Sequence, residues 1–400
     1  MPRLAPTAWA VQTRGLPPAF WLLWTGTLVN RLGGAVGPFL ALYLTGSRGF
    51  STAQAGVVLT AYGFGSAVGQ PVGGLLADRV GRRTTMLLSR VGTSGAVLVV
   101  GAASGLAALL VAVFVYGLLL DLVRPAVQAA VADIVPAADR VRAYALNFWA
   151  VNFAFAIAIP VGGFLAERGY WLLFALDAVT CLAFAALVAW RLPETRPERT
   201  PDTPVGSLRE VLADRLLLAL VECVVVQAAV YLQAFSTLPL VLRDDGLGAS
   251  GYGIVLGLNG VLIIVLQPVV LGVLARRDRG LLLLVAGLLQ GGGVALHGLA
   301  GSLVGHSLVV AVWTVGEVLQ AGLLASVVAG LAPVHLRGRY LGVFGASFGL
   351  AGLIAPLAGT QLLAQLGEGA LWGACAVAGV VSAVGLRRVS DVAAARTPID

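Results

Sequence analysis

The sequence contains no lysine, and all 26 of its basic residues are arginine. Charged residues make up only 11% of the 400 positions, whereas soluble domains carry about 25%. Hydrophobic residues make up 58%, and a soluble core cannot absorb that many without exposing large apolar patches. These deficits exclude an ordinary soluble domain and predict a polytopic membrane protein, built of helices because open sheet edges stay unpaired in lipid.

Cysteine and histidine are scarce, with three residues of each. The cysteines, Cys181, Cys223 and Cys375, lie singly in apolar runs and form no CxxC pair, so we interpret them as small buried hydrophobic residues. The histidines, His297, His306 and His335, lie at or near the ends of apolar runs. The sequence has no GxxxxGK(S/T) loop, no HExxH motif and no Ser-His-Asp set. We therefore expect no catalytic residue, no metal, no cofactor and no nucleic-acid partner.

Twelve apolar runs are long enough to cross a bilayer, which takes about 20 residues of helix. They lie at 18–44, 53–77, 84–103, 107–132, 142–166, 170–190, 213–242, 250–275, 280–300, 306–332, 338–364 and 369–388. The longest polar interval, 191–212, is rich in proline, threonine and charge, which is typical of a linker. The sequence thus predicts an all-α membrane protein with an N-terminal six-helix bundle at 1–190, a cytoplasmic linker at 191–212 and a C-terminal six-helix bundle at 213–400.

Arginine is distributed unevenly between the two predicted sides of the membrane. If the N-terminus is cytoplasmic, the inner segments hold 21 arginines, with Arg90 counted among them, and the outer loops hold three. Arginine concentrates in cytoplasmic loops, so both termini are predicted to be cytoplasmic. The arginine usage and the bias to Ala, Gly, Val and Leu are typical of a high-GC bacterial genome, which predicts a bacterial inner membrane.

The two halves share residues at a constant offset of 197. Gly56, Val58, Gly63, Gln70, Pro71 and Val72 recur as Gly253, Val255, Gly260, Gln267, Pro268 and Val269, and the arginine pairs 79/82 and 140/142 recur as 276/279 and 337/339. A shared offset over such distant segments predicts two parallel, pseudo-symmetric repeats. Transporters of this design hold the substrate between the repeats near the midplane and rock one repeat against the other, for which a monomer suffices.

The tract GLLADRVGRR at 74–83, between the second and third runs, resembles the signature loop of the major facilitator superfamily. The matching positions are Gly74, Leu76, Ala77, Asp78, Arg79, Gly81, Arg82 and Arg83. In that family the acid and arginines of this loop, with an acid at the inner end of the fourth span, latch the two halves while the protein is open outward. The resemblance assigns the second acid to Asp133. The alternative is a positively charged anchor without a gating role.

Within the superfamily the chain most resembles the twelve-span drug:proton antiporters, in NRLGGAVGPFLALYL at 30–44, RPAVQAAVADIVP at 124–136 and WTVGEVLQ at 313–320. The fifth span of such antiporters carries GxxxGPxxGG. The corresponding stretch FAIAIPVGG at 155–163 keeps Pro160, Gly162 and Gly163 but has Ile159 where the glycine before the proline would stand.

Ionisable residues inside predicted spans are costly, so each is a candidate functional group. Glu317 lies near the centre of its span, with no basic residue in that run, and burial disfavours the charged form of a carboxyl group. Glu317 is therefore our first candidate for the proton carrier, Glu222 the second, and Asp121 a third because it occupies almost the repeat-equivalent position of Glu317. A hydrogen-bonded structural acid is the alternative for Glu317, and Asp177 is expected to be a wet structural residue.

Two arginines lie inside predicted spans. Arg124 is three residues from Asp121, so the two share a helix face, either as a neutralised structural pair or as part of substrate or proton handling. Arg31 has three alternative roles: it pairs with Asp121, it binds an anionic group of the substrate, or its side chain snorkels, extending its charged end to the membrane surface. Apolar pockets with a few polar groups suit amphipathic ligands, and the predicted cavity wall consists of Asn30, Arg31, Tyr62, Arg124, Asn152, Gln227, Tyr231, Asn259 and Trp313.

These features together predict a secondary active transporter that couples protons to the efflux of small hydrophobic or amphipathic compounds by alternating access. Its expected partners are a small-molecule substrate, protons and the lipid bilayer. The alternative is a proton symporter or a facilitator for a specific metabolite, for which Arg31 and Arg124 favour an anion.

Overall fold

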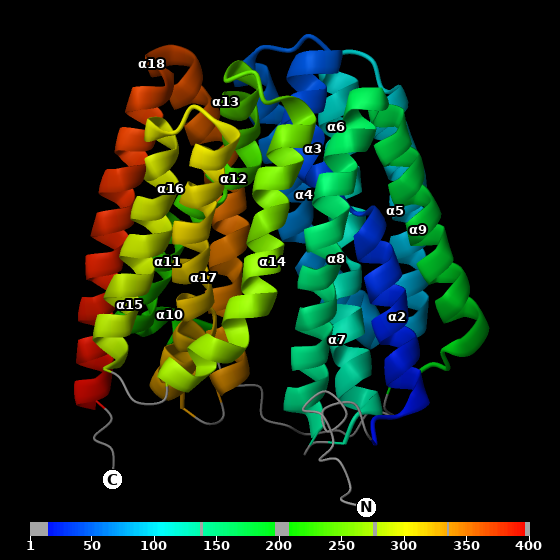
Figure 1. Ribbon diagram of the computed structural model, residues 1–400. Coiled ribbons are helices and arrows are strands. Elements are labelled where there is room, and N and C mark those ends of the chain that lie inside the picture. Colours follow the sequence, from blue (N-terminus) through cyan, green and yellow to red (C-terminus); the bar gives the residue numbers. More distant parts are fainter. Residues whose placement is uncertain (1–14, 137–138, 197–207, 275–277, 334–335, 397–400) are drawn as a thin grey trace, which may run out of the picture.

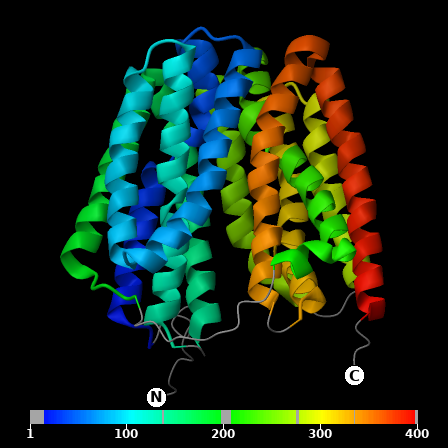
Figure 2. The same ribbon diagram turned by 180° about the vertical axis from the view of Figure 1, so that it is seen from behind.

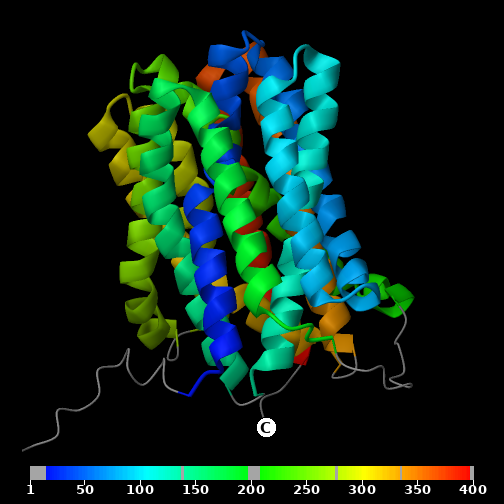
Figure 3. The same cartoon turned by 90° about the vertical axis from the view of Figure 1, so that its right-hand side faces the viewer.

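The computed structural model describes residues 15–136, 139–196, 208–274, 278–333 and 336–396, and these ranges form helices without a strand. Figure 1 shows the helices side by side in two groups, which we call the first half (up to residue 196) and the second half (from residue 208). Figure 3, turned by 90°, shows that the helices run roughly parallel from one end of the molecule to the other. Half of the predicted linker, residues 197–207, lies outside the described residues.

The first half begins with a helix that a proline opens. Pro18 stands at the first position of α2, where its fixed φ suits the helix and its missing N–H is not needed. Ser51 and Gln54 form a capping box at the start of α4. The elements are α2 (Pro18–Gly33), α3 (Val36–Leu42), the π-helical η1 (Tyr43–Ser47), α4 (Thr52–Arg79), α5 (Arg82–Ala102), α6 (Leu106–Asp121), α7 (Val123–Ile134), α8 (Arg140–Arg168) and α9 (Tyr170–Arg191).

The second half follows the same order with more irregular turns. Its elements are α10 (Leu208–Ala213), α11 (Arg215–Tyr231), α12 (Gln233–Ser236), α13 (Leu238–Asp244), α14 (Gly248–Leu274), α15 (Arg279–Gly287), η3 (Leu288–Gly292), α16 (Gly293–Ala295), η4 (Leu296–Leu299), α17 (Leu303–Leu331) and α18 (Arg337–Arg396). Gly367 adopts φ +79° within α18 and divides it into two helices, because only glycine adopts such a φ at little cost.

Nine helices within the described ranges are long and apolar enough to cross a membrane, which supports the predicted all-α membrane fold. The predicted count of twelve is not confirmed. The predicted run 18–44 is broken between α2 and α3. The predicted runs 338–364 and 369–388 correspond to the two helices that meet at Gly367 within α18. A break such as that between α2 and α3 depends on local backbone conformation, which the apolar character of a run does not reveal.

Two seams of close helix contact join the halves. In one, Gly253 of α14 faces the backbone of Ile159 and Gly163 in α8, and in the other Gly56 of α4 faces Thr360 in α18. The offset of 197 converts one seam into the other, since it carries residue 56 to 253 and residue 163 to 360. The two seams are therefore the same interface formed twice, as a pseudo-symmetric pair of repeats requires.

The apolar cores show at which end of the molecule the two halves pack against each other. One large cluster of buried residues includes Phe39 and Ile159 of the first half and Leu240, Tyr252 and Trp372 of the second. Two smaller clusters each stay within one half: the first lies around 16–23, 77–86, 123–146 and 184–192, and the second around 211–224, 323–340 and 386–393. The shared core lies at the end opposite the first and last described residues, and toward those residues α4 and α18 diverge (Figure 2).

Candidate functional site

Glu317 of α17 is held by neutral donors from two other helices. The Asn259 side-chain amide in α14 donates to Glu317 Oε2 at 2.7 Å, and the Tyr231 hydroxyl in α11 donates to Glu317 Oε1 at 3.1 Å. Asn259 also donates to Thr314 Oγ1 at 3.0 Å. Among the described residues, no arginine or histidine lies within ion-pair distance of Glu317. The carboxyl group therefore has hydrogen bonds but no counter-charge.

Aromatic packing extends this cluster along α17. Trp313 lies one helical turn before Glu317 and meets the Tyr231 ring edge-on, with 5.7 Å between the ring centroids. Trp313 is fully buried and Asn259 is 2% exposed. The structure thus brings together four predicted residues, Tyr231, Asn259, Trp313 and Glu317, which we call the Glu317 cluster. In the described conformation its members contact one another, so their predicted contact with substrate stays a prediction.

The first half carries a related acid with a different partner. Asp121 of α6 accepts a hydrogen bond from Ser66 in α4 and pairs with Arg124 Nε at 2.6 Å. Since α4 is the repeat equivalent of α14, both acids bond to the same helix of their own repeat. They differ in charge balance, because Asp121 has a cation beside it and Glu317 has none.

Arg124 and Arg31 differ in their surroundings. The Arg124 side chain pairs with Asp121 and is 47% exposed. The pair thus forms, and a part for Arg124 in substrate or proton handling stays a prediction. Arg31 in α2 is half-buried, and no hydrogen bond or ion pair joins its guanidinium to any described residue. The Asp121 carboxylate acts electrostatically on Arg31 without a bond to it, so the guanidinium has N–H donors available to an anion.

Asn30 and Gln227 lie inside their own halves, so their assignment to a wall between the halves finds no support. Asn30 donates to Cys181 Sγ and accepts from Arg90. The Gln227 amide donates to the Gly287 carbonyl oxygen and to Gln290 Oε1, both at 3.1 Å, and accepts from Ser382. A polar residue in an apolar run does not reveal which face of its helix it occupies.

Tyr62, Asn152 and Glu222 take separate positions. Tyr62 stacks on Tyr116 with 5.7 Å between ring centroids. The Asn152 amide donates to the Phe148 carbonyl oxygen of its own helix. Glu222 is exposed and has no hydrogen bond or ion pair with a described residue, so the burial on which its proton-carrier assignment depends is absent in this conformation.

Arg90 was placed on the inner side by the sequence, and this placement is wrong. It is 2% exposed within α5, and its guanidinium donates to Asn30 Oδ1 at 3.0 Å and to the Leu120 carbonyl oxygen at 2.6 Å. The same polar network contains Asp177, which accepts from the Tyr116 hydroxyl at 2.8 Å and is 1% exposed, not wet as expected. The distance in sequence from the loop was the signal that Arg90 lies inside the helix, because Arg90 stands two helical turns beyond the arginines of the loop.

The signature loop forms a compact ionic cluster. Arg82 pairs with Asp78 at 2.9 Å and with Asp133 at 3.1 Å, and it donates to the Ala77 carbonyl oxygen. Gly81 adopts φ +104° as the cap of α5, which explains why the motif has a glycine there. None of these residues bonds to a described residue of the second half, which agrees with a conformation whose halves are joined at the opposite end.

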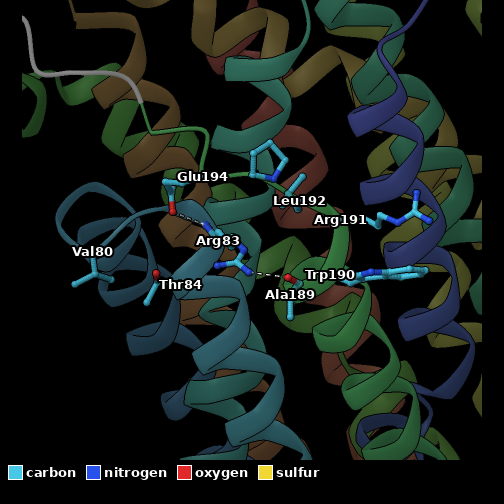
Figure 4. A pocket seen from close by; sticks show the side chains of 9 residues that line it. Val80, Arg83, Thr84, Ala189, Trp190, Arg191, Leu192 and Glu194 are labelled. Atoms are coloured by element: carbon cyan, nitrogen blue, oxygen red, sulfur yellow. Dashed lines mark hydrogen bonds between the residues drawn. The ribbon is translucent and has the colours of Figure 1, made fainter.

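Glu194, which the sequence analysis missed, completes this cluster. Its carboxylate accepts from the Arg82 and Arg83 backbone N–H groups at 2.7 and 3.2 Å, and a negative charge at a helix N-terminus is favourable. Figure 4 shows Arg83 and Glu194 lining a pocket of about 530 Å³ that also includes Trp190 and Arg191. The only sequence signal was an acid just after the sixth apolar run. Arg79 contributes its carbonyl oxygen to Arg196, and Gly74 faces Pro125.

The motif of the fifth run lies in the seam between α8 and α14. A side chain at Gly163 would meet the Ala249 and Ser250 backbone, and one at Gly257 would meet the Pro160 ring. Gly162 faces the other way, toward Ala35 and Phe39. These small residues therefore permit the close approach of the two halves.

The chain belongs to the major facilitator superfamily, whose family model, "Major Facilitator Superfamily", matches residues 23–356. It is accordingly a membrane transporter and not an enzyme. The chain is 24% identical over 355 residues to a "Na(+), Li(+), K(+)/H(+) antiporter" of Planococcus maritimus, covering 80% of this chain and 83% of that protein. It is 25% identical over 152 residues to the "Quinolone resistance protein NorA" of Staphylococcus aureus (strain N315), covering 38% and 39%.

A solved structure of a peptide transporter, POT, has the same fold. It superposes with a TM-score of 0.77 over 95% of this chain and 96% of that chain, at 18% identity. At this identity the likeness concerns the fold alone. It agrees with the two pseudo-symmetric helical halves described above.

Proposed function

We propose that the protein is a proton-coupled antiporter that exports small hydrophobic or amphipathic compounds across a bacterial inner membrane, with both termini in the cytoplasm. Glu317 carries the proton. Binding of substrate and binding of the proton alternate, and each favours one of the two positions of the halves. The antiporter of Planococcus maritimus supports exchange against protons, and the quinolone resistance protein supports a drug-like substrate.

The observation that carries this proposal is the environment of Glu317. A buried carboxylate without a cation is costly, and both of its oxygens accept hydrogen bonds, from Asn259 and from Tyr231. A proton on Glu317 removes the charge and turns one of these oxygens into a donor. The three groups come from α17, α14 and α11. A change of protonation at Glu317 therefore alters the contacts between three helices of the second half, which is the step that a coupled transporter requires.

A second candidate function rests on Arg31. Its guanidinium has no hydrogen-bond or ion-pair partner among the described residues, and Arg124 beside Asp121 is half exposed. A guanidinium with unused N–H donors and a second, half-exposed arginine suit an anionic solute. This geometry supports a symporter or facilitator for an anionic metabolite as the alternative to drug export.

The test uses inside-out vesicles energised with a pH gradient, acid inside. We expect wild type to accumulate a fluorescent lipophilic cation. In Glu317→Gln the gradient-driven accumulation should fall by at least about tenfold, which corresponds to about 1.4 kcal/mol. Glu317→Gln should still exchange labelled for unlabelled cation without a gradient, because glutamine cannot take up the proton but keeps the side-chain shape and one acceptor oxygen for the donors Asn259 and Tyr231.

Glu222→Gln is the matched control, because Glu222 is an exposed acid of the same half. Accumulation that survives Glu317→Gln but fails in Glu222→Gln would transfer the carrier role to Glu222. If wild type ignores the cation and moves an anion instead, in an Arg31-dependent manner, the antiport proposal is wrong and the second candidate stands.

A further inference from the structure

Two buried histidines connect the Glu317 cluster to the end of the molecule that lies opposite the first and last described residues. His306 Nε2 lies 2.8 Å from Asp245 Oδ2, and His306 Nδ1 lies 2.9 Å from His297 Nδ1. The Trp313 indole N–H donates to His297 Nε2 at 3.4 Å. The side chain of Asp245 is 24% exposed, whereas both histidines are at most 1% exposed. A line of contacts thus runs from solvent to Trp313.

The protons of this line can be assigned by elimination. An indole N–H is only a donor, so His297 Nε2 accepts and its proton is on Nδ1. His306 Nδ1 must then accept from His297, so the proton of His306 is on Nε2 and is donated to the Asp245 carboxylate. With both rings neutral, every contact has one donor and one acceptor.

A further proton on either ring breaks this pattern. It leaves two donors facing each other, either between the histidines or between His297 and Trp313. The Trp372 ring, 5.7 Å from His297, offers no relief, because its indole nitrogen is also only a donor and has no partner among the described residues. A proton entering the line therefore separates His297 from His306 or from Trp313.

The other repeat shows that the fold does not require these histidines. The offset of 197 carries His297 to Val100 and His306 to Leu109, and both of these residues are fully buried apolar side chains. Burying two imidazoles where the equivalent position accepts valine and leucine is unfavourable without a return. The histidine pair is a property of the second half alone, as is the Glu317 cluster.

We propose that Asp245, His306 and His297 form a second proton-binding site, and that its protonation releases Trp313 and so alters the hydrogen bond from Tyr231 to Glu317. The site deepens the proposed antiport function and rests on it. Trp313 transmits the change, because it contacts His297 on one side and the Tyr231 ring on the other.

The charged groups around the site favour a proton. Asp244 lies next to Asp245 in sequence and is paired with Arg243 at 2.8 Å, and Glu368 of α18 acts electrostatically on Asp244, Asp245 and His306. Three carboxylates and one arginine thus surround the outer end of the line. By the predicted orientation this end faces the outside, from which an antiporter takes up protons.

The test is a pH titration of tryptophan emission in purified protein in nanodiscs, because an imidazolium quenches a neighbouring indole. His297 contacts two of the eight tryptophans, Trp313 and Trp372. We expect emission to fall by up to a quarter when wild type is acidified, because two of the eight tryptophans contact His297. The double variant His297→Val/His306→Leu, which copies the equivalent residues of the first half, should lose that fall, and Asp245→Asn should shift its midpoint.

Identical pH profiles for wild type and the double variant would overturn the proposal. Should the double variant fail to fold, Asp245→Asn keeps the test valid, because its side chain is partly exposed and an unchanged midpoint would also contradict the site. The emission titration does not depend on transport. A vesicle assay that shows no proton coupling would therefore refute the proposed function without deciding whether the histidine site exists. If the titration is histidine-dependent but coupled transport is unaffected in the double variant, the link to Glu317 is wrong.

Discussion

Gly253→Ala should shift the balance between the two positions of the halves. A Cβ at Gly253 would lie 2.8 Å from the Ile159 carbonyl oxygen and 3.3 Å from the Pro160 Cα, and these are backbone atoms that cannot move aside alone. Overpacking of this kind costs about 1–3 kcal/mol. The described conformation, which needs this seam, should therefore lose about 5- to 150-fold in population relative to one that opens it.

The shift can be measured by electron paramagnetic resonance between spin labels at Val80 and Leu341. These residues are 45% and 40% exposed and belong to different halves. A variant that opens the seam should increase the population of short distances between them, because rocking brings the other ends together. Gly345→Ala is the control, since a Cβ at Gly345 has no neighbour within 4 Å. Identical distance distributions for the two variants would refute the seam as a determinant of conformation.

Three further predictions concern the signature-loop cluster and the polar network around Asp177 in the first half. Asp133→Asn should lower the free energy of unfolding by about 1–3 kcal/mol and Asp78→Asn by less than about 1 kcal/mol, because their side chains are 19% and 70% exposed; equal losses in thermal unfolding would contradict this ranking. Tyr116→Phe should destabilise by about 1–3 kcal/mol, since buried Asp177 loses a donor, and an unchanged melting temperature would count against it. Glu194→Gln should cost about 0.3–1 kcal/mol from the charge at the start of α5, with an effect that shrinks in high salt.

The membrane class and the repeat were predictable because they depend on composition and on a constant spacing. The offset found in glycines and prolines reappears as contacts, since Gly56 faces Thr360 where Gly253 faces Gly163. The helix breaks were predictable only in part. The gap between the predicted runs 338–364 and 369–388 agrees with the division of α18 at Gly367. The break near Gly34 depends on backbone conformation, which residue type alone does not determine.

The candidate site was predictable where charge is rare. Glu317 is an acid in a run without a basic residue, and this pattern by itself indicates Glu317 as the first candidate for the proton carrier. The predicted place of Asn30 and Gln227 on the cavity wall finds no support in this conformation, because a side chain's polarity does not reveal its direction. His297 and His306 were passed over because each stands near the end of a run, and only the fold places them in contact.

Proton release from purified protein tests the role of Glu317 most directly. In weakly buffered detergent solution with a pH-sensitive dye, addition of a lipophilic cation should release protons from wild type and from Glu222→Gln, and none from Glu317→Gln. Equal release from wild type and Glu317→Gln would contradict the account, because the proton would then come from another group.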